Sequence, residues 1–317
     1  MSELQAPPET RAGFAAVIGA PNAGKSTLVN RLVGSKVSIV TQKVQTTRFP
    51  VRGVAMDGQA QIVLVDTPGI FTPRRRLDRA MVRSAWGGAE DADVVVHLVD
   101  AQAQLAVQEG SPSAADKRAA VDVQSIVEGL KGAGRKAFLA INKIDHMRRD
   151  KLLGLGKALF DDDIYDRVFM ISAATGDGVE DLKHALAERM PAGPWLYPED
   201  QAADLPARLL AAEITREKIY LRLHEELPYA ASVETTAFAE QKAGLRIEQT
   251  IFVEREGQRP IVLGKGGQTL KWIGEQARKE LTEIMDQPVH LFLHVKVKEN
   301  WAEERGLYSD LGLDFDV

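Results

Sequence analysis

Two glycine-rich stretches of this 317-residue chain each place a lysine directly after a glycine. The first, GAPNAGKST, spans 19–27, and the second, LGKGG, spans 263–267. Glycine lets backbone N–H groups turn toward an anion, and lysine adds positive charge, so both stretches can hold phosphate. Only the first has a serine after its lysine, and a hydroxyl there can bind a divalent cation. The two stretches are therefore expected to bind different ligands.

The first stretch matches the pattern G-x-x-x-x-G-K-[ST] at every fixed position. It lies between an apolar run at 14–19, which is typical of a buried strand, and a helical pattern at 25–33. In this context Lys25 reaches the β- and γ-phosphates, Ser26 offers its hydroxyl to Mg²⁺, and the helix N-terminus attracts negative charge. The residues predicted to bind the nucleotide here are Gly19, Asn22, Ala23, Gly24, Lys25, Ser26 and Thr27.

The sequence NKID, at 142–145, predicts which base is bound. The Asp145 carboxylate can accept hydrogen bonds from both N1–H and the exocyclic amine of guanine, whereas adenine offers no such pair of donors. The asparagine of NKID can hold another edge of the base, and the lysine stem can cover the ring. We therefore expect GTP or GDP as the ligand, with the base contacted by Asn142, Lys143, Asp145, Ser172 and Ala173.

Two further segments carry groups that could act at Mg²⁺ and the γ-phosphate. DTPG, at 66–69, places Asp66 to hold Mg²⁺ through water and the Gly69 N–H to approach a γ-phosphate. In QTTR, at 45–48, a threonine can bind Mg²⁺ only while the γ-phosphate is present, and this contact orders the loop. We favour Thr47 over Thr46 for that role. The predicted metal ligands are Ser26, Thr47 and Asp66, and the groups predicted to act at the γ-phosphate are Lys25, Thr47 and Gly69.

The second stretch has more closely spaced glycines and no hydroxyl after its lysine, so it is not expected to bind Mg²⁺-nucleotide. GKGG matches the G-x-x-G loop of KH domains, which clamps the sugar-phosphate backbone of single-stranded nucleic acid. Residues 257–298 carry seven Lys or Arg against four Asp or Glu, in a chain of net charge −5. The predicted RNA-binding residues are Gly264, Lys265, Gly266, Gly267, Lys271 and Arg278. An ordinary solvated helix face is the alternative for Lys271, Arg278 and Lys279, and Trp272 and Ile273 are interpreted as helix core.

The elements that must position these residues follow from the apolar pattern. Strand-sized apolar runs alternate with helical stretches, which favours an α/β P-loop domain with a mostly parallel sheet and helices on both faces; the runs are 14–19, 61–66, 94–100, 136–142 and 167–172. Residues 51–56 and 61–65, joined through Asp57 and Gly58, are typical of an antiparallel hairpin at one edge. The polar segment 101–118 is interpreted as a surface loop.

Four prolines between 190 and 206 interrupt the helical pattern and predict a domain boundary. Beyond it come a helical stretch at 207–227, two alternating strands around Gly244, a short apolar piece, the GKGG loop, a helix to about Met285 and a strand. This is the order of an α+β type II KH domain. The predicted division is a polar N-terminal extension 1–13, a nucleotide-binding domain 14–190, a linker 191–206, a KH domain 207–300 and a tail 301–317.

Composition excludes several classes of protein. The chain has no cysteine, which excludes disulfides, thiolate nucleophiles and cysteine-ligated metals. Its net charge of −5 excludes a uniformly basic nucleic-acid binder, and its apolar fraction of 44% is that of a globular protein. The apolar runs are too short to cross a bilayer, and the first ten residues lack the pattern of a signal peptide. We expect a cytoplasmic protein.

The motifs PNAGKST, QTTR, DTPG and NKID resemble those of translation-factor-like GTPases. With the later stretch VLGKGGQTLKWIGEQAR and the tail VKVKENWAEERGLYSDLGLD, the chain is similar to the bacterial Era family over nearly its whole length. The resemblance implies a GTP-dependent switch that binds the 3′ region of small-subunit (16S) ribosomal RNA and acts in small-subunit assembly and rRNA maturation. It also implies a monomer that can associate peripherally with the inner membrane.

Many GTPases place a glutamine after the glycine of DxxG to orient the attacking water, and this chain has Ile70 there. Isoleucine cannot hydrogen-bond water, so slow intrinsic turnover is expected. In the resembling families an asparagine at the position of Asn22 helps hold K⁺ against the phosphates, which implies K⁺ as a second cation and a catalytic role for Asn22. A simple turn residue is the alternative.

Two other functions stay open from the sequence. One is a GTPase coupled to tRNA modification or to large-subunit assembly, which would share the first domain. The other is an RNA-binding module that uses GTP as a structural ligand, which Ile70 keeps open.

Overall fold

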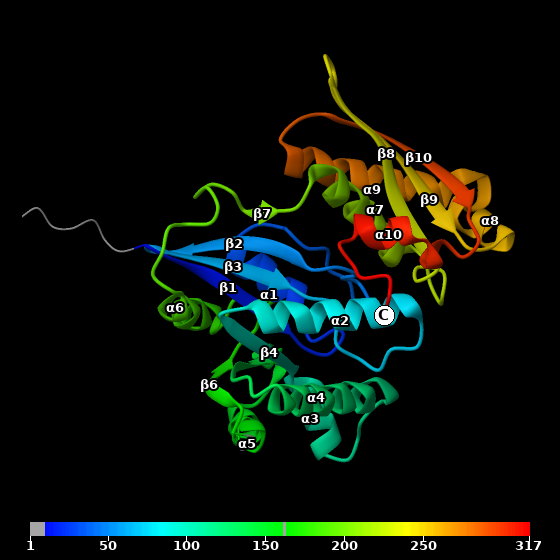
Figure 1. Cartoon of the computed structure of the whole chain (residues 1–317). Helices are drawn as coiled ribbons and strands as arrows, with labels where there is room; N and C mark the ends of the chain where they lie inside the picture. Colours follow the sequence, from blue (N-terminus) through cyan, green and yellow to red (C-terminus); the bar gives the residue numbers. More distant parts are fainter. Residues whose placement is uncertain (1–9, 161–162) are drawn as a thin grey trace, which may run out of the picture. The chain divides into compact units, whose positions relative to one another are not determined.

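The computed structural model of the protein describes residues 10–160 and 163–317 (Figure 1). It divides into two compact units, of which the first comprises residues up to 38, 47–204 and 317. The second comprises 39–46 and 205–316, so the chain contributes to it twice. Residues 1–9 of the predicted polar extension lie outside the described residues.

The described part of the first unit is built on a seven-stranded sheet with the order β6-β5-β4-β1-β3-β2-β7. The strands β1, β3, β4, β5 and β6 run parallel, whereas β2 is antiparallel to both of its neighbours. This confirms the predicted mostly parallel sheet. The strand bounds are β1 (Arg11–Ile18), β2 (Val51–Asp57), β3 (Ala60–Asp66), β4 (Val94–Asp100), β5 (Ala137–Asn142), β6 (Tyr165–Met170) and β7 (Ala203–Asp204).

The hairpin of β2 and β3 forms as predicted, with Gly58 in the turn at φ 56°. Its predicted place at the sheet edge is wrong, because β7 pairs antiparallel with the outer side of β2. β7 has only two residues, too few to show an alternating pattern in the sequence. The first strand begins at Arg11, three residues before the apolar run that marks it.

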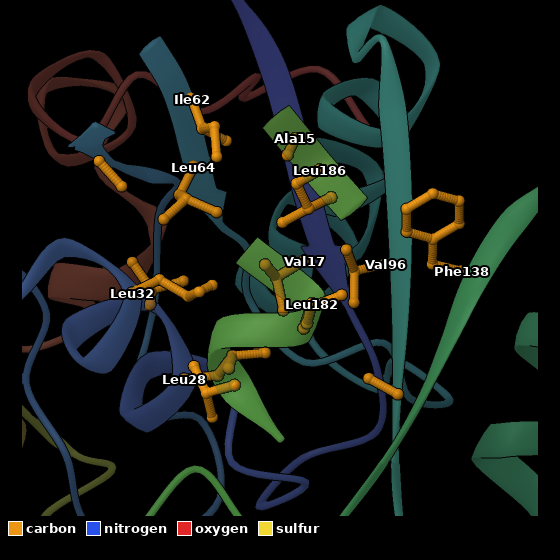
Figure 2. Close-up of a cluster of buried hydrophobic side chains, with 14 of the residues drawn as sticks. Ala15, Val17, Leu28, Leu32, Ile62, Leu64, Val96, Phe138, Leu182 and Leu186 are labelled. Atoms are coloured by element: carbon orange, nitrogen blue, oxygen red, sulfur yellow. The ribbon is translucent and has the colours of Figure 1, made fainter. Parts of the chain in front are cut away.

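Helices cover both faces of this sheet, as predicted. On one face, α1 and α6 pack against inward-facing strand residues (Figure 2), including Val17, Leu64 and Val96. On the other face, a second apolar cluster contains residues of α2, α3, α4 and α5. The helix bounds are α1 (Lys25–Val33), α2 (Arg76–Asp91), α3 (Ala101–Gln108), α4 (Ala114–Gly132), α5 (Arg149–Phe160) and α6 (Val179–Arg189).

The interpretation of 101–118 as a surface loop is wrong, because most of it is helical. The Asp100 carboxylate caps the start of α3 by accepting from the backbone N–H of Gln102 and Ala103. Ser113 and Asp116 form a capping box that begins α4. The glycine and proline that suggested a loop fall in the short connection 109–113, where they separate two helices.

The second unit has the order predicted for a type II KH domain. Its sheet is β10-β9-β8, with β8 and β9 antiparallel and β9 and β10 parallel. The predicted helix at 207–227 ends earlier, at Arg222, because Leu223 is extended and Glu225 has a φ of 56°. The bounds are α7 (Ala207–Arg222), β8 (Ala231–Gln241), β9 (Gly244–Val253), α8 (Arg259–Leu263), α9 (Gln268–Met285), β10 (Val289–Val297) and α10 (Arg305–Asp310).

The final segment is folded rather than trailing. Trp301 is buried and donates from its indole N–H to the Ala230 carbonyl at 3.0 Å. Tyr308 of α10 is also buried and donates to the Ala302 carbonyl. Among the described residues, no helix combines the length and apolar character needed to cross a membrane.

Candidate nucleotide and RNA sites

The loop between β1 and α1 has the geometry of a phosphate cradle. Gly24 takes a φ of 102°, and a Cβ atom there would lie 2.4 Å from Asn142 Nδ2. At Gly19 a Cβ atom would lie 2.5 Å from the Leu98 carbonyl oxygen. Both positions therefore have room for glycine only. Asn22 also has a positive φ, 63°, which asparagine tolerates better than most residues.

Lys25 is folded onto the backbone of this loop. Its ammonium donates to the carbonyls of Gly19 and Ala20 at 3.1 and 3.0 Å. Burial lowers the pKa of Lys25 to about 8, although the nearby Asp66 carboxylate opposes this. A phosphate group bound beside the ammonium would favour the charged form again. The side chain is thus held where it can exchange loop carbonyls for phosphate oxygens.

The three predicted metal ligands lie together. Ser26 Oγ donates to Asp66 Oδ2 at 2.7 Å and lies 2.9 Å from Thr47 Oγ1, which is itself 3.4 Å from Asp66 Oδ2. Asp66 is fully buried, which raises the pKa of its carboxyl group. Its Oδ1 has no hydrogen-bond partner among the described residues. A buried carboxylate beside two hydroxyls suits Mg²⁺, which binds oxygen ligands.

The two candidate threonines differ in where their hydroxyls point. Thr46 Oγ1 lies 2.6 Å from Thr41 Oγ1 and donates to the Lys43 carbonyl at 2.7 Å. Thr47 Oγ1 instead lies with Ser26 and Asp66, as described above. This geometry supports the preference for Thr47 as the metal ligand.

Asn142 braces the phosphate loop from the end of β5. Its Nδ2 donates to the Ala23 carbonyl at 2.8 Å, and its Oδ1 accepts from the Ala173 N–H at 2.9 Å. Both amide atoms therefore tie the phosphate loop to the segment after β6, and the side chain is 2% exposed. The predicted contact of Asn142 with the base edge stays a prediction beside this bracing role, because the amide has a second N–H and a second oxygen lone pair.

The remaining base-site residues lie at the carboxyl ends of β5 and β6. Asp145 is exposed, and its Oδ1 accepts from Ser172 Oγ at 2.7 Å, which fixes the direction of the carboxylate. Lys143 has a φ of 67° and pairs with Asp100 Oδ2 at 2.6 Å. Asp100 was missed from the sequence, although it closes an apolar strand run just as Asp66 does. Asp100 both caps α3 and holds the Lys143 ammonium.

Gly69 and Ile70 pack directly against the phosphate loop. A Cβ atom at Gly69 would lie 3.0 to 3.1 Å from atoms of Pro21, so a larger residue would push the two segments apart. The Ile70 N–H donates to the Gly19 carbonyl at 3.1 Å, and its side chain is buried in the apolar cluster on the α2 face. The side chain that follows DxxG is therefore turned into the core.

The GKGG loop joins α8 to α9 through three glycines with positive φ, at 75°, 61° and 79°. A Cβ atom at Gly264 would lie 2.3 Å from Thr269 Oγ1, whereas one at Gly266 meets nothing within 4 Å. Lys265 and Gly266 are exposed. The loop thus presents a lysine and open backbone at the start of α9, where N–H groups favour anions.

On α9 the predicted division into core and surface holds. Ile273 is fully buried, and Trp272 packs partly buried against the same cluster, under the Arg222 guanidinium at 5.4 Å from its ring. Lys271 and Arg278 are exposed, with Lys271 3.9 Å from Glu275. Their RNA contacts stay a prediction.

Comparison with known proteins finds two family models along the chain. The model described as 50S ribosome-binding GTPase matches residues 14–143, and the KH domain model matches residues 226–302. The chain is 73% identical to a GTPase Era of Caulobacter vibrioides over 310 residues, which cover 98% of each protein. It is 59% identical to a GTPase Era of Maricaulis maris, over 97% of this chain and 98% of the relative.

Two solved structures match both units together. One is a variant of Aquifex aeolicus Era bound to GDP and AlF4⁻, and the other is Era in complex with MgGDPNP and nucleotides 1506–1542 of 16S ribosomal RNA. Each has a TM-score of 0.85 and 36% sequence identity, and each match covers 96% of this chain and 99% of the solved chain.

Proposed function

This chain belongs to the GTPase Era family and is a GTPase, and from this premise we propose that it binds the 3′ region of 16S ribosomal RNA under control of its nucleotide. In this role it acts in assembly of the small ribosomal subunit and in rRNA maturation. The observation that carries the proposal is the joining of a complete guanine-nucleotide site to a KH fold. The Era chain solved with MgGDPNP and a 16S fragment has the same two parts over nearly its whole length.

We propose a task for each group of the nucleotide site. Backbone N–H groups of the phosphate loop and the Lys25 ammonium hold the phosphates, and Asp145 accepts from the guanine edge. Ser26 and Thr47 would hold Mg²⁺ directly and Asp66 through water. The ion, when bound, neutralises charge on the β- and γ-phosphates. Because Thr47 would bind the ion only with the γ-phosphate present, it supplies the difference between the GTP and GDP states.

Slow intrinsic hydrolysis is part of the proposal, since the buried Ile70 side chain offers no hydrogen bond to water. We propose that K⁺, held by Asn22 against the phosphates, compensates for the missing polar group. A cation there would stabilise the charge that develops during phosphoryl transfer.

Replacing K⁺ with Na⁺ at constant ionic strength is expected to lower kcat by about 100-fold, the lower end of the effect of losing one group that stabilises charge in the transition state. Steady-state phosphate release measures this. Asn22→Gly is the matched control, because glycine keeps the positive φ but removes the side-chain oxygen. If Asn22→Gly retains the preference for K⁺, Asn22 is only a turn residue; equal rates in both salts would exclude the ion.

The switch itself is tested by RNA affinity in two nucleotide states. A single-stranded RNA that copies the 3′ end of 16S rRNA is expected to bind about tenfold more tightly with GDPNP than with GDP, within the usual range of coupling. By linkage the RNA then raises GDPNP affinity over GDP affinity by the same factor. Fluorescence anisotropy measures both. Equal RNA affinity in the two states would remove the switch and leave both sites standing.

Two alternatives were open from the sequence, and the module that uses GTP only as a structural ligand is excluded because the chain is a GTPase. GTPases of tRNA modification or large-subunit assembly share the first unit, and the description of the model for 14–143 names the 50S subunit. The relatives at 73% and 59% identity, however, match the KH part as well.

On the family resemblance we further propose that the protein acts as a monomer in the cytoplasm and associates peripherally with the inner membrane.

A further inference from the structure

The helix α2 begins with a dense group of positive charges to which the nucleotide site assigns no role (Figure 1). Residues 70–89, which follow the DTPG segment, contain five arginines, one acid and no lysine, a net charge of +4 in a chain of net charge −5. All of them belong to the first unit, so this charge is concentrated on one element of the GTPase domain. The five cations are Arg74, Arg75, Arg76, Arg79 and Arg83.

Most of these side chains are exposed. Arg74 and Arg75 lie directly before the first turn of α2 and are exposed, as are Arg79 and Arg83 within the helix. Residues four apart lie on the same side of a helix, so Arg79 and Arg83 are neighbours there. The Arg79 Nε–H donates to the backbone oxygen of Val317 at 3.4 Å, which uses one of the five N–H groups of its guanidinium. These four arginines are here called the α2 arginine surface.

The position of these charges opposes the stability of the helix that carries them. The N-terminal end of a helix favours negative charge, and the buried Asp78 supplies it, since its Oδ2 accepts from the N–H groups of Arg74 and Arg75 at 3.0 Å each. Arginines at this same end are disfavoured by the helix dipole, and like charges four residues apart repel each other. Charges that weaken their own helix are typical of a surface that serves a ligand.

The residue types indicate a phosphate backbone as that ligand. Arginine, with its planar fork of N–H donors, binds phosphate oxygens in pairs, and every cation of this segment is an arginine. Helices that lie on a membrane surface place tryptophan, phenylalanine or leucine beside their basic face. On α2, whose residues are all described, no large apolar side chain is exposed. The α2 arginine surface therefore fits a nucleic acid better than a lipid surface.

We propose that the α2 arginine surface binds the phosphate backbone of ribosomal RNA and is a second RNA contact, distinct from the GKGG loop. The inference rests on the proposed function, in which this chain binds 16S ribosomal RNA. Phosphate contacts carry no base sequence, so the surface contributes affinity and leaves sequence recognition to other groups. It also places an RNA contact on the GTPase unit itself, five residues beyond Gly69 of the DTPG segment.

The test uses the full-length chain in which Arg74→Gln, Arg75→Gln and Arg79→Gln are combined. The probe is an RNA copying nucleotides 1506–1542 of 16S ribosomal RNA, the length in the solved Era complex. Each phosphate contact contributes about 0.7 to the salt dependence of log K, or about fivefold in affinity at 0.1 M salt. Loss of three contacts is therefore expected to weaken binding about 100-fold and to reduce that salt dependence by about two. Anisotropy titrations with GDPNP at several KCl concentrations measure both.

Thermal melting separates a binding role from a structural one. Glutamine is a good helix former and removes cations from the N-terminal end of α2, so the melting temperature of the variant should be unchanged or higher. The matched control combines Lys117→Gln, Lys131→Gln and Lys157→Gln, which remove the same charge from exposed positions on α4 and α5. The control should bind RNA with the affinity and salt dependence of the wild type.

Four outcomes would contradict the α2 arginine surface as an RNA site. The first is wild-type RNA affinity and salt dependence in the arginine variant. The second is an equal loss in the lysine control, which would be a response to net charge. The third is a loss of RNA binding with a lowered melting temperature, which would mean that the arginines support the helix. The fourth is unchanged RNA affinity with lost binding to vesicles of phosphatidylglycerol and phosphatidylcholine, which would assign the surface to a membrane.

The wild type distinguishes this inference from the proposed function. A wild-type chain that binds the RNA while the arginine variant binds it equally well overturns the second contact and leaves the proposed function standing. A wild-type chain that does not bind the RNA at any salt concentration overturns the proposed function, and the RNA contact of α2 with it.

Discussion

Asp145→Asn is expected to weaken GTP and GDP binding by about two to three orders of magnitude and to make xanthosine nucleotides the better ligands. Two hydrogen bonds to a charged carboxylate contribute about 3–4 kcal/mol together, which corresponds to this change in Kd. Xanthine carries a carbonyl where guanine carries its exocyclic amine, so it accepts from the new amide. Guanine instead places its exocyclic amine, a hydrogen-bond donor, against the amide nitrogen of the new asparagine, which is also a donor.

The hydrogen bond from Ser172 lets the Asp145→Asn substitution change the base-facing group and keep the side-chain orientation. Ser172 donates to Oδ1 of the carboxylate at 2.7 Å, and an asparagine keeps an oxygen to accept that bond. The variant therefore retains its orientation while its outer group changes from acceptor to donor. Titrations with fluorescent guanosine and xanthosine diphosphates measure the change in base preference. Asp150→Asn, at a neighbouring exposed carboxylate, is the control and should bind as wild type.

A guanine preference that survives Asp145→Asn would mean that the base is read elsewhere. Backbone groups of the segment 172–173 would then be the remaining candidates.

The sequence predicted the binding site correctly where a ligand requires particular residue types within one short segment. The glycines at 19 and 24 and the hydroxyl of Ser26 are required by phosphate and Mg²⁺ within eight residues, so the pattern alone located the loop. It failed at α3, whose start depends on the cap supplied by Asp100 and whose residues lack a clear apolar period. Local polarity resembled a loop, whereas the Asp100 cap and the burial of Ala101, Ala103 and Leu105 stabilise a helix.

Long-range pairing lay beyond the reach of the sequence pattern. Ile39 is buried in the core of the KH unit, and residues 39–46 contact α7 across about 170 to 180 residues of chain, as in the bond from Val40 to Glu217. Nothing in the local composition of 39–46 distinguishes a core residue of the KH unit from an ordinary switch loop. The two-residue β7 was missed for a related reason, because its only signal is its pairing with β2.

The second large effect is expected at the GKGG loop. Lys265→Glu combined with Gly266→Asp should weaken binding of the 16S 3′-end RNA at least about 100-fold, because one cation is lost and two anions face the phosphates. The fold should tolerate the change. Gly266 has a φ of 61°, which aspartate tolerates, and a Cβ atom there meets nothing within 4 Å.

The matched control is Lys265→Gln combined with Gly266→Asn, which has nearly the same shape and no added charge. It should lose only the contribution of one lysine, with the salt dependence of log K reduced by about 0.7. Anisotropy titrations at several KCl concentrations measure both variants. If the two variants bind RNA equally, the loop acts through its backbone and shape rather than its charge.

The same pair of variants decides whether the two phosphate-holding loops work together. GTP hydrolysis in K⁺ buffer, measured with and without the RNA, is expected to rise with RNA in the wild type and not in the charge-reversed variant. An increase in both would mean that RNA reaches the GTPase by another surface. No increase in the wild type, despite tight binding, would separate RNA recognition from hydrolysis. The coupling would then lie in affinity alone, and RNA affinities measured with GDPNP and with GDP would report its size.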